Sequence, residues 1–461
     1  MGKSVMARIG LEIHGYLAMH KTHQKLFCRC TVDQDAAPNT TVCPRCTGQP
    51  GSKPMLPNKE AVEKVVTCAL MLDCSINKKL IFQRKHYDWP DLPKGYQITI
   101  SGTYSHPVGE HGKYLDVGIT ECHLEEDPAR WDPETGLVDY NRSGYPLIEI
   151  VTEPDFTSAG EVKDWLESLL TTLSYLKAVN KNAGIKCDVN VSTEHHPRVE
   201  IKNVNSIKTI VLAIDGEIKR QHEVVAQREK VFAHTRSPPD TYGKTHFMRS
   251  KETALDYMFI PEPDLPLIHI TDALVENIQK MLPEKPHIKI ERYKNMKVSA
   301  TDAKILASDL ALADLFEKLA KTVDPLLAAK WLRHELLKIM NVTQRTLQEV
   351  EFDEKHIAEL LQMVVKKEIT DQTAEGLLKQ MIEKSFSPRA YVAQKGLGII
   401  SSEEELGKLT QKVVSEHPEA VKDYLAGEEK ALNFLIGKVM ALTKGKAKAD
   451  TVKELLKRRI C

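Results

Sequence analysis

The hydrophobic pattern of this 461-residue chain changes its period once, and that change constrains the fold more than any other feature. Up to about residue 270, apolar and polar residues alternate in short segments, which is the two-residue period of β-strands. Beyond that point, apolar residues recur at the 3.6-residue period of amphipathic helices. A passage at 260–266, with three prolines, separates the two patterns. The sequence therefore predicts an α+β protein with an antiparallel-sheet cradle, a helical linker domain and a small helical tail.

Domain boundaries follow from the same pattern. We predict a cradle domain at residues 1–290, a helical linker domain at 291–401 and a helical tail at 402–461. Asp324 suits the N-cap of a helix and Pro325 its first position. Apolar stripes predict helices after the capping-box motif Ser158-x-x-Glu161 and at residues 207–231, 324–340, 353–365 and 373–382.

Composition excludes several classes of protein. Sixty-four basic residues balance sixty-four acidic ones, so the chain is neither a disordered polyelectrolyte nor a uniformly basic nucleic-acid coat. No apolar run approaches the 18 residues of a membrane-spanning helix, and residues 1–10 hold no apolar core of a secretory signal. We therefore expect a cytoplasmic protein with no membrane partner.

Four of the nine cysteines form two close pairs, Cys28-x-Cys30 and Cys43-x-x-Cys46. Two such pairs separated by a short loop are typical of a tetrahedral zinc site with four sulfur ligands. A closed site of this kind is structural, because no coordination position is left for a substrate. The alternative is a set of four unrelated buried thiols.

Three predicted strands carry carboxylate, imidazole and amide side chains on one face. These are Glu12 and His14 in residues 9–14, Glu121, His123 and Glu125 in 119–126, and Asp188, Asn190 and Ser192 in 185–192, continued by Glu200 and Lys202. The simple interpretation is an antiparallel sheet with one solvated side. The alternative is a Mg²⁺ site, since this ion binds one or two protein carboxylates and leaves the rest to substrate phosphates. Gly243-Lys244-Thr245 is not the end of a P-loop, because Pro238 stands where that motif requires glycine.

Longer blocks of sequence resemble one family throughout the chain. The chain is similar to the B subunits of the glutamyl/aspartyl-tRNA amidotransferases. The matching blocks are residues 9–14, 25–28, 39–44, 91–97, 123–127, 139–155, 186–192, 199–203, 259–266, 432–440 and 443–447. The resemblance implies that ATP phosphorylates the side-chain carboxylate of glutamate or aspartate misacylated on tRNA, and that ammonia then displaces the phosphate to form the amide.

The resemblance also implies roles for particular residues. A Mg²⁺ ion near the γ-phosphate would be held by Glu12, His14, Glu125 and Glu126. Contacts to ATP and substrate would come from Lys94, Arg142, Asp188, Asn190, Glu200 and Lys202. For Lys94 and Arg142 the alternative is a pair of loop salt bridges. Where the family commonly has Glu-Asp-Ala-Gly, this chain has Glu126-Asp127-Pro128-Ala129, and Pro128 cannot donate a backbone hydrogen bond to phosphate.

The source of ammonia is expected in another chain, because no Gly-Gly-Ser-Ser-Gly-Gly run of the amidase type occurs here. The resemblance implies a glutaminase partner, which is the amidase or A subunit, together with a small C subunit. Ammonia would reach the site through an internal channel, which Glu149 or Lys202 could line.

The last 24 residues are strongly basic. Residues 438–461 hold eight lysines and arginines against two acidic residues, a net charge of +6, so residues 1–437 sum to −6. We predict that Lys444, Lys446, Lys448 and Lys453 contact tRNA phosphates, as the resemblance to a YqeY-like tail implies. The alternative is a solvated helix end.

Two other functions remain open at this point. A non-catalytic zinc-bearing tRNA adaptor would use the cysteine pairs and the basic tail without the polar strand faces. An amino-acid kinase acting on free glutamate would not need the tail. The sequence does not decide whether misacylated Glu-tRNA(Gln), Asp-tRNA(Asn) or both are the substrates.

Overall fold

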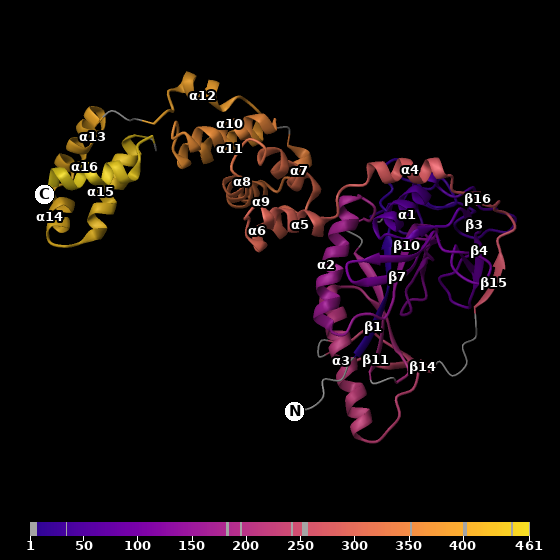
Figure 1. Ribbon diagram of the computed structural model, residues 1–461. Helices are drawn as coiled ribbons and strands as arrows, with labels where there is room; N and C mark the ends of the chain where they lie inside the picture. The colour runs from indigo at the N-terminus through magenta and orange to yellow at the C-terminus, as the bar shows by residue number, and fades with distance from the viewer. Residues whose placement is uncertain are drawn as a thin grey trace. The chain divides into compact units, whose positions relative to one another are not determined.

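The chain forms two compact units, Met1–Lys285 and Pro286–Cys461, in a computed structural model (Figure 1). The structure describes residues 7–33, 35–180, 184–193, 196–240, 243–250, 257–350, 353–399, 403–443 and 446–460. Within these ranges no helix is both long enough and apolar enough to cross a membrane.

Among the described residues, the first unit is built on a twelve-stranded sheet. Its strand order is β14-β13-β12-β11-β1-β10-β7-β5-β4-β15, with β6 also pairing with β7 and β2 pairing with β6. The strands are β1 (Ala7–Tyr16), β2 (Ser75–Ile76), β4 (Gln83–His86), β5 (Tyr96–Thr99), β6 (Gly109–Tyr114), β7 (Val117–Glu126), β10 (Pro146–Thr152), β11 (Ile185–Thr193), β12 (Val199–Val204), β13 (His234–Arg236), β14 (Phe247–Ser250) and β15 (Met258–Pro261). Two small sheets pair β3 (Lys79–Leu80) with β16 (Ile268–His269) and β8 (Arg130–Trp131) with β9 (Val138–Asp139).

The predicted alternation of β1 is confirmed. Ile9, Leu11 and Ile13 are fully buried in the main hydrophobic core. This core also takes up the apolar faces of α1 (Lys59–Met71), α2 (Ala159–Tyr175) and α3 (Ile207–Ala226) and part of α4 (Asp272–Met281). Figure 1 shows α2 and α3 lying along the sheet. Because successive side chains of a strand point to opposite faces, the polar residues of β1 lie on the face away from this core.

The predicted antiparallel cradle needs one correction. Most neighbouring strands pair antiparallel, but β12 and β13 pair parallel, with Val199 opposite His234. A parallel pair requires a crossover connection, and α3 supplies it between the two strands. The sequence pattern indicates strands and helices but not which strands become neighbours.

Two helix predictions in this unit are also corrected in detail. The Ser158 hydroxyl accepts a hydrogen bond from the Glu161 amide at 3.3 Å, but the Glu161 carboxylate accepts one from the amide of Thr157 and not from that of Ser158. The N-terminus of α2 is therefore capped without a reciprocal capping box. Helix α3 ends at Ala226, before the predicted residue 231, because Arg228 adopts a left-handed backbone with φ of 61°.

The second unit is helical and holds two separate hydrophobic cores among its described residues, one within 293–392 and one within 406–456. The boundary at residue 401 stays a prediction. The helices are α5 (Pro286–Asn295), α6 (Ala300–Leu306), α7 (Leu310–Leu319), α8 (Pro325–Trp331), α9 (Leu337–Thr343), α10 (Glu354–Val365), α11 (Asp371–Glu383), α12 (Pro388–Lys395), α13 (Glu403–Glu416), α14 (Pro418–Leu425), α15 (Glu429–Leu442) and α16 (Ala449–Ile460).

The helix predicted at 324–340 is interrupted. Asp324 caps α8 and Pro325 occupies its first turn, as predicted. A π-helical segment, Leu332–Leu336, then separates α8 from α9. Such a segment holds an extra residue in one turn, which a search for the 3.6-residue period does not detect. The helices predicted at 353–365 and 373–382 are confirmed as α10 and α11.

Candidate active site

Two clusters of acidic side chains lie on the polar face of the sheet. The His14 cluster consists of His14, Glu125 and Glu149, and the Glu12 cluster consists of Glu12, Asp188 and Glu200. In each cluster one potential ligand atom from every residue lies within 4.8 Å of the others.

Strand register brings the clusters together. On β1, Glu12 lies opposite Asp188 of β11, and His14 lies opposite Glu149 of β10. Directly opposite residues of antiparallel strands share a face, so the alternating polar residues of separate sequence segments meet. The sequence predicts Glu12, His14 and Glu125 as one set of ligands, whereas the structure divides them between two neighbouring clusters.

The His14 cluster has a titratable group as its cation. The Nδ1 atom of His14 lies 3.7 Å from a Glu125 oxygen and 3.8 Å from a Glu149 oxygen. Burial disfavours the charged imidazole, but the two carboxylates outweigh burial and raise the pKa of His14 to about 9. One imidazole nitrogen and two carboxylates form a donor set that a divalent cation can use once the imidazole has lost its proton.

A second histidine fixes the position of Glu149. The His123 Nε2 atom lies 2.8 Å from a Glu149 oxygen, and both side chains are largely buried. Burial opposes the charge on His123, but Glu149 outweighs it and raises the pKa of His123 to about 10. Contacts of this kind orient a carboxylate that serves as a metal ligand.

The Glu12 cluster has a fixed cation of its own. The Lys202 ammonium lies 2.9 Å from Asp188 and 3.4 Å from Glu200, and the Asn203 amide donates to Asp188 at 2.7 Å. Burial opposes the charge, but Asp188 and Glu200 raise the pKa of Lys202. The ammonium therefore already neutralises much of this cluster.

Glu12 and Asn190 form the open side of that cluster. The Asn190 amide donates to Glu12 at 3.0 Å, while its Oδ1 atom is buried with no hydrogen-bond partner among the described residues. Burial, and then the charges of Glu149 and Glu200, raise the pKa of Glu12. Both residues line a cavity of about 270 Å³ beside Arg8 and Arg198. An unsatisfied buried amide oxygen indicates that a ligand completes this position.

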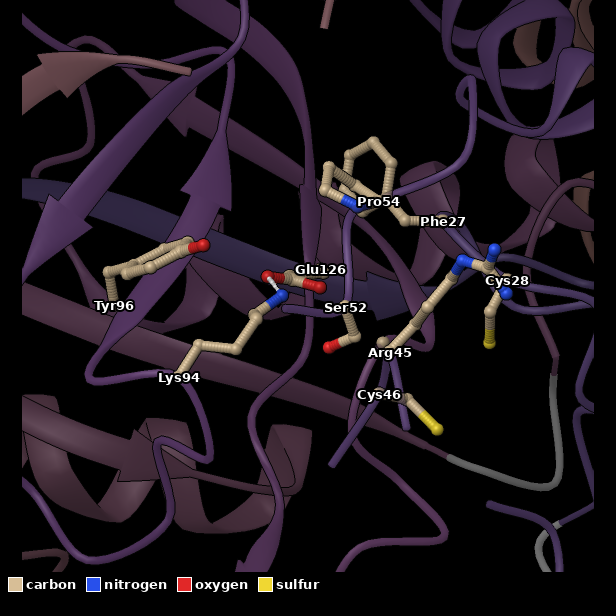
Figure 2. Close-up of a pocket in the computed structure, with 10 residues that line it drawn as sticks. Phe27, Cys28, Arg45, Cys46, Ser52, Pro54, Lys94, Tyr96 and Glu126 are labelled. Carbon is tan, nitrogen blue, oxygen red and sulfur yellow. Dashed lines mark hydrogen bonds and ion pairs between the residues drawn. The ribbon is translucent and has the colours of Figure 1, made fainter. Parts of the chain in front are cut away.

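Glu126 lies apart from both clusters. Its carboxylate forms an ion pair with Lys94 and accepts a hydrogen bond from the Ile98 amide at 3.0 Å. Figure 2 shows Lys94 and Glu126 on one side of a small pocket, with Cys28 and Cys46 on another. Neighbouring positions of a strand face opposite ways, so Glu126 does not join Glu125.

Arg142 is also held in an ion pair. Its Nε atom lies 2.8 Å from the Asp127 carboxylate, which accepts a further hydrogen bond from the Tyr16 hydroxyl at 2.8 Å. The loop salt bridges that are the alternative for Lys94 and Arg142 are thus present in the structure. Their predicted contact with phosphate stays a prediction.

Lys186 is a basic residue on the polar face to which the sequence pattern assigns no role. It lies on β11 directly opposite His14. Among the described residues its ammonium has no hydrogen bond and no ion pair, although Asp127, Asp91 and Asp188 act on it electrostatically. Burial lowers the pKa of Lys186. This side chain is a cation beside the His14 cluster that no carboxylate holds.

The four predicted zinc ligands come together. One sulfur from each of Cys28, Cys30, Cys43 and Cys46 lies within 4.8 Å of the others, and the Cys43 and Cys46 sulfurs are 3.8 Å apart. A tetrahedron with zinc–sulfur distances of about 2.3 Å has sulfurs about 3.8 Å apart, so the donor set fits this ion. The fully buried Lys25 places its ammonium 3.5 Å from the Cys46 sulfur, where it would offset the charge of thiolate ligands.

The predicted tRNA-binding lysines lie at or just before the start of α16. Val452 and Leu456 are buried in the core of the tail. Lys448 and Lys453 are exposed, and Lys446 is half-buried. Lys444, which is predicted together with them, lies outside the described residues.

Sequence reasoning assigns Glu149 only a channel-lining role and assigns none to His123 and Lys186. A signal for Glu149 is available, because it is a single carboxylate within the otherwise aliphatic run from Leu147 to Val151. A buried charge in a central strand requires a partner, which points to a site. The contacts of His123 and Lys186 depend on strand register, which one sequence does not give.

Comparison with known proteins covers both units. Residues 7–276 match the family described as the GatB/GatE catalytic domain, and residues 314–460 match the family described as the GatB domain. A curated relative from Methanothermobacter thermautotrophicus is 44% identical over 98% of this chain and 100% of its own length. Relatives from Methanopyrus kandleri and Methanococcus maripaludis are 42% and 40% identical, covering 98% and 100% of both chains respectively. All three are named as the B subunit of an aspartyl/glutamyl-tRNA(Asn/Gln) amidotransferase, which confirms the resemblance found in the sequence blocks.

Proposed function

The chain belongs to the GatB/GatE family, and from that premise we propose that it is the B subunit of a tRNA-dependent amidotransferase. In this ligase reaction, ATP phosphorylates the side-chain carboxylate of glutamate or aspartate misacylated on tRNA. Ammonia then attacks the acyl phosphate and releases phosphate, which gives Gln-tRNA(Gln) or Asn-tRNA(Asn). The observation that carries the proposal is the convergence of the His14 and Glu12 clusters on one sheet face within the matched catalytic domain.

We place Mg²⁺ in the His14 cluster. The Glu12 cluster already contains the Lys202 ammonium. The carboxylates of the His14 cluster are instead balanced by two imidazoles, His14 itself and His123, and the His14 imidazole can release its proton to become a ligand. When bound, Mg²⁺ would offset negative charge on the transferring phosphoryl group. His123 holds Glu149 in position for this role, and Glu12 extends toward the same region from the next outward-facing position of β1.

Lys186 is our candidate for the phosphate contact. Phosphoryl transfer depends chiefly on positioning and on neutralising charge, which requires a cation not already held by a carboxylate. Lys94 and Arg142 are each paired with an acidic side chain, whereas Lys186, opposite His14, forms no ion pair with any residue that the structure describes. Asn190, Asp188 and Glu200 would shape the substrate side of the face.

The proposed enzyme also includes a structural zinc site and partner subunits. A structural Zn²⁺ bound by Cys28, Cys30, Cys43 and Cys46 would stiffen one wall of the cavity beside Glu126. The name of the relatives implies an assembly of several chains. We propose that an amidase, the A subunit, supplies ammonia and that a small C subunit accompanies it. The ammonia channel through Glu149 or Lys202 and the cytoplasmic location both stay predictions.

The tail would hold the tRNA body. Exposed lysines at the start of α16 meet phosphates through electrostatics that salt screens. Replacing Lys446, Lys448 and Lys453 together by alanine should weaken tRNA binding and make the slope of log affinity against log salt shallower. An unchanged slope would remove the tail from the proposal.

The direct test of the proposed function is Glu125→Gln in the assembled enzyme, assayed with misacylated tRNA. We expect tRNA-stimulated ATP cleavage and amide formation to fall about 1,000-fold, because metal stabilisation of phosphoryl transfer is worth several kcal/mol. Binding of tRNA should remain measurable. Glu167→Gln, which changes an exposed carboxylate of α2, is the matched control. Unchanged turnover in Glu125→Gln would overturn the assignment.

The adaptor alternative is less well supported, because the matched domain is described as catalytic and because an adaptor has no use for two converging carboxylate clusters. A tRNA-binding chain without tRNA-stimulated ATP cleavage in the complete assembly would restore it.

A further inference from the structure

Two of the four tryptophans form a ring pair at the surface, in which Trp89 is exposed and Trp131 is half-buried. Trp89 is 54% exposed, and its ring meets that of Trp131 edge-to-face with centroids 5.7 Å apart. Trp165 and Trp331 are only 3% and 5% exposed. We call Trp89 and Trp131 the tryptophan ledge. Large aromatic side chains are mostly buried in folded proteins, so a paired arrangement at the surface calls for an explanation.

The fold holds the ledge in a fixed geometry. Trp89 lies in the loop between β4 and β5, and Trp131 lies in β8. The Ala129 amide donates to the Asp91 carbonyl at 2.9 Å, which ties the two segments together. The Leu92 amide donates to the Trp89 carbonyl at 3.2 Å, and the Leu92 side chain is buried beneath the loop. A pre-ordered ledge loses little conformational entropy when a ligand stacks on it.

The ledge is continuous with the proposed active face. On the loop that carries Trp89, Tyr87 interacts electrostatically with Glu125, and Asp91 does so with Arg142 and Lys186. Trp131 follows Glu125 by six residues, so the chain between them spans no more than about 20 Å even when fully extended. The amino acid that is to be amidated sits on the 3′-terminal ribose of the tRNA. Unpaired bases at that end must therefore pass close to these loops whenever the carboxylate reaches the His14 cluster.

The surroundings of the ledge match a single-stranded nucleic acid. Arg130, next to Trp131, is exposed, and so are Asp88 beside Trp89 and Asp132 on the other side of Trp131. Lys85 lies over the ring of Tyr257 at 4.5 Å from its centroid, and that ring packs on Tyr87 two residues before Trp89. Exposed aromatic rings interleaved with cations are the features that bind unpaired bases by stacking and their phosphates by charge.

We propose that the tryptophan ledge stacks the unpaired bases at the 3′ end of the tRNA acceptor arm and so positions the aminoacyl ester at the polar face. This inference rests on the proposed function and adds a contact that positions the substrate. Trp89 and Trp131 are positioning residues, because they hold the RNA end and do not touch the reacting carboxylate.

The test is a double-mutant cycle on binding with the full chain in its assembly. One arm compares the cognate tRNA with the same tRNA lacking its unpaired 3′ nucleotides, and the other compares the wild type with Trp89→Ala. We expect truncation to weaken wild-type binding about 5- to 150-fold, the range for losing one stacked base, and to have little effect on Trp89→Ala. Trp89→Phe should restore most of the difference because it keeps an aromatic ring. Phe232→Ala, which removes another exposed aromatic side chain, is the control.

Two outcomes would contradict the proposal that the tryptophan ledge stacks RNA bases. In one, truncation weakens Trp89→Ala as much as it weakens the wild type. In the other, Trp89→Ala keeps the wild-type response to RNA but loses a partner chain during purification, which would make the ledge a protein interface. Either result leaves Glu125→Gln as a separate test, so failure of the ledge is distinguishable from failure of the proposed function.

Discussion

The two carboxylate clusters share one sheet face, yet they are neutralised in different ways. In the Glu12 cluster a lysine ammonium lies 2.9 Å and 3.4 Å from two carboxylates. In the His14 cluster the positive groups are imidazoles: His14 lies 3.7 Å and 3.8 Å from the two carboxylates, and His123 lies 2.8 Å from Glu149. A lysine remains charged near neutral pH, whereas an imidazole can give up its proton to become a metal ligand. We therefore propose that the kind of cation already present decides which of the two clusters admits a metal ion.

Removing the Lys202 ammonium from the Glu12 cluster should have the largest effect on stability. Lys202→Met leaves Asp188 and Glu200 buried without a counter-charge, which we expect to lower the free energy of unfolding by about 3 kcal/mol. Mg²⁺ should recover part of that loss, because the emptied cluster then resembles its neighbour. Chemical denaturation with and without MgCl₂ measures both effects.

The control for this variant is Lys163→Met, which removes a half-exposed lysine of α2. The comparison between the clusters would be broken if Lys202→Met were as stable as the wild type, or if Mg²⁺ stabilised the variant and the wild type equally.

Replacing Lys186, the lysine beside the His14 cluster, should have the next largest effect, which we expect on KM for ATP. Lys186→Ala should raise KM for ATP at least about tenfold, since a hydrogen bond to a charged group contributes about 1.5–3 kcal/mol. Lys186→Arg should retain most of the affinity. Lys94→Ala should change KM less, because Glu126 already holds that ammonium. Steady-state kinetics over a range of ATP concentrations would contradict this order if Lys94→Ala had the larger effect.

The pH dependence of metal binding gives the smallest and most specific effect. Without metal, the pKa of His14 is about 9, so the imidazole is protonated at neutral pH. A metal ion must displace that proton, and its affinity should therefore rise by up to about tenfold per pH unit between pH 7 and 9, then level off. Titration calorimetry in buffers of different ionisation enthalpy would detect the released proton. His14→Asn should bind more weakly and lose the slope; a wild-type affinity independent of pH would contradict the assignment.

The sequence predicted which residues lie on the polar face of the sheet, but not that they separate into the His14 and Glu12 clusters. Alternation in β1, β7 and β11 placed Glu12, His14 and Glu125 on the polar side, and the structure confirms that side. The pairing of each residue with its neighbours depends on which strands are adjacent. This is why Glu149 joins His14 and why Lys202 reaches Asp188, contacts that no local pattern contains. The cysteine pairs were easier to interpret, because their ligands lie within one short segment.

Two details of the helices could not be predicted from the sequence, the π-helical segment after α8 and the end of α3. A period of 3.6 residues located α10 and α11 and the start of α8. The π-helical segment at Leu332–Leu336 keeps its apolar residues in the core while adding a residue to the turn, so the pattern looks continuous. The end of α3 depends on the left-handed backbone of Arg228, which its residue type does not announce.

We propose that Mg²⁺ enters the His14 cluster because Lys202 already neutralises the Glu12 cluster. The most direct measurement is Mn²⁺ binding, as a stand-in for Mg²⁺, followed by electron paramagnetic resonance in the wild type, Glu149→Gln and Glu200→Gln. We predict one bound ion in the wild type, its loss in Glu149→Gln and its retention in Glu200→Gln. Loss of the ion in Glu200→Gln together with its retention in Glu149→Gln would contradict the account.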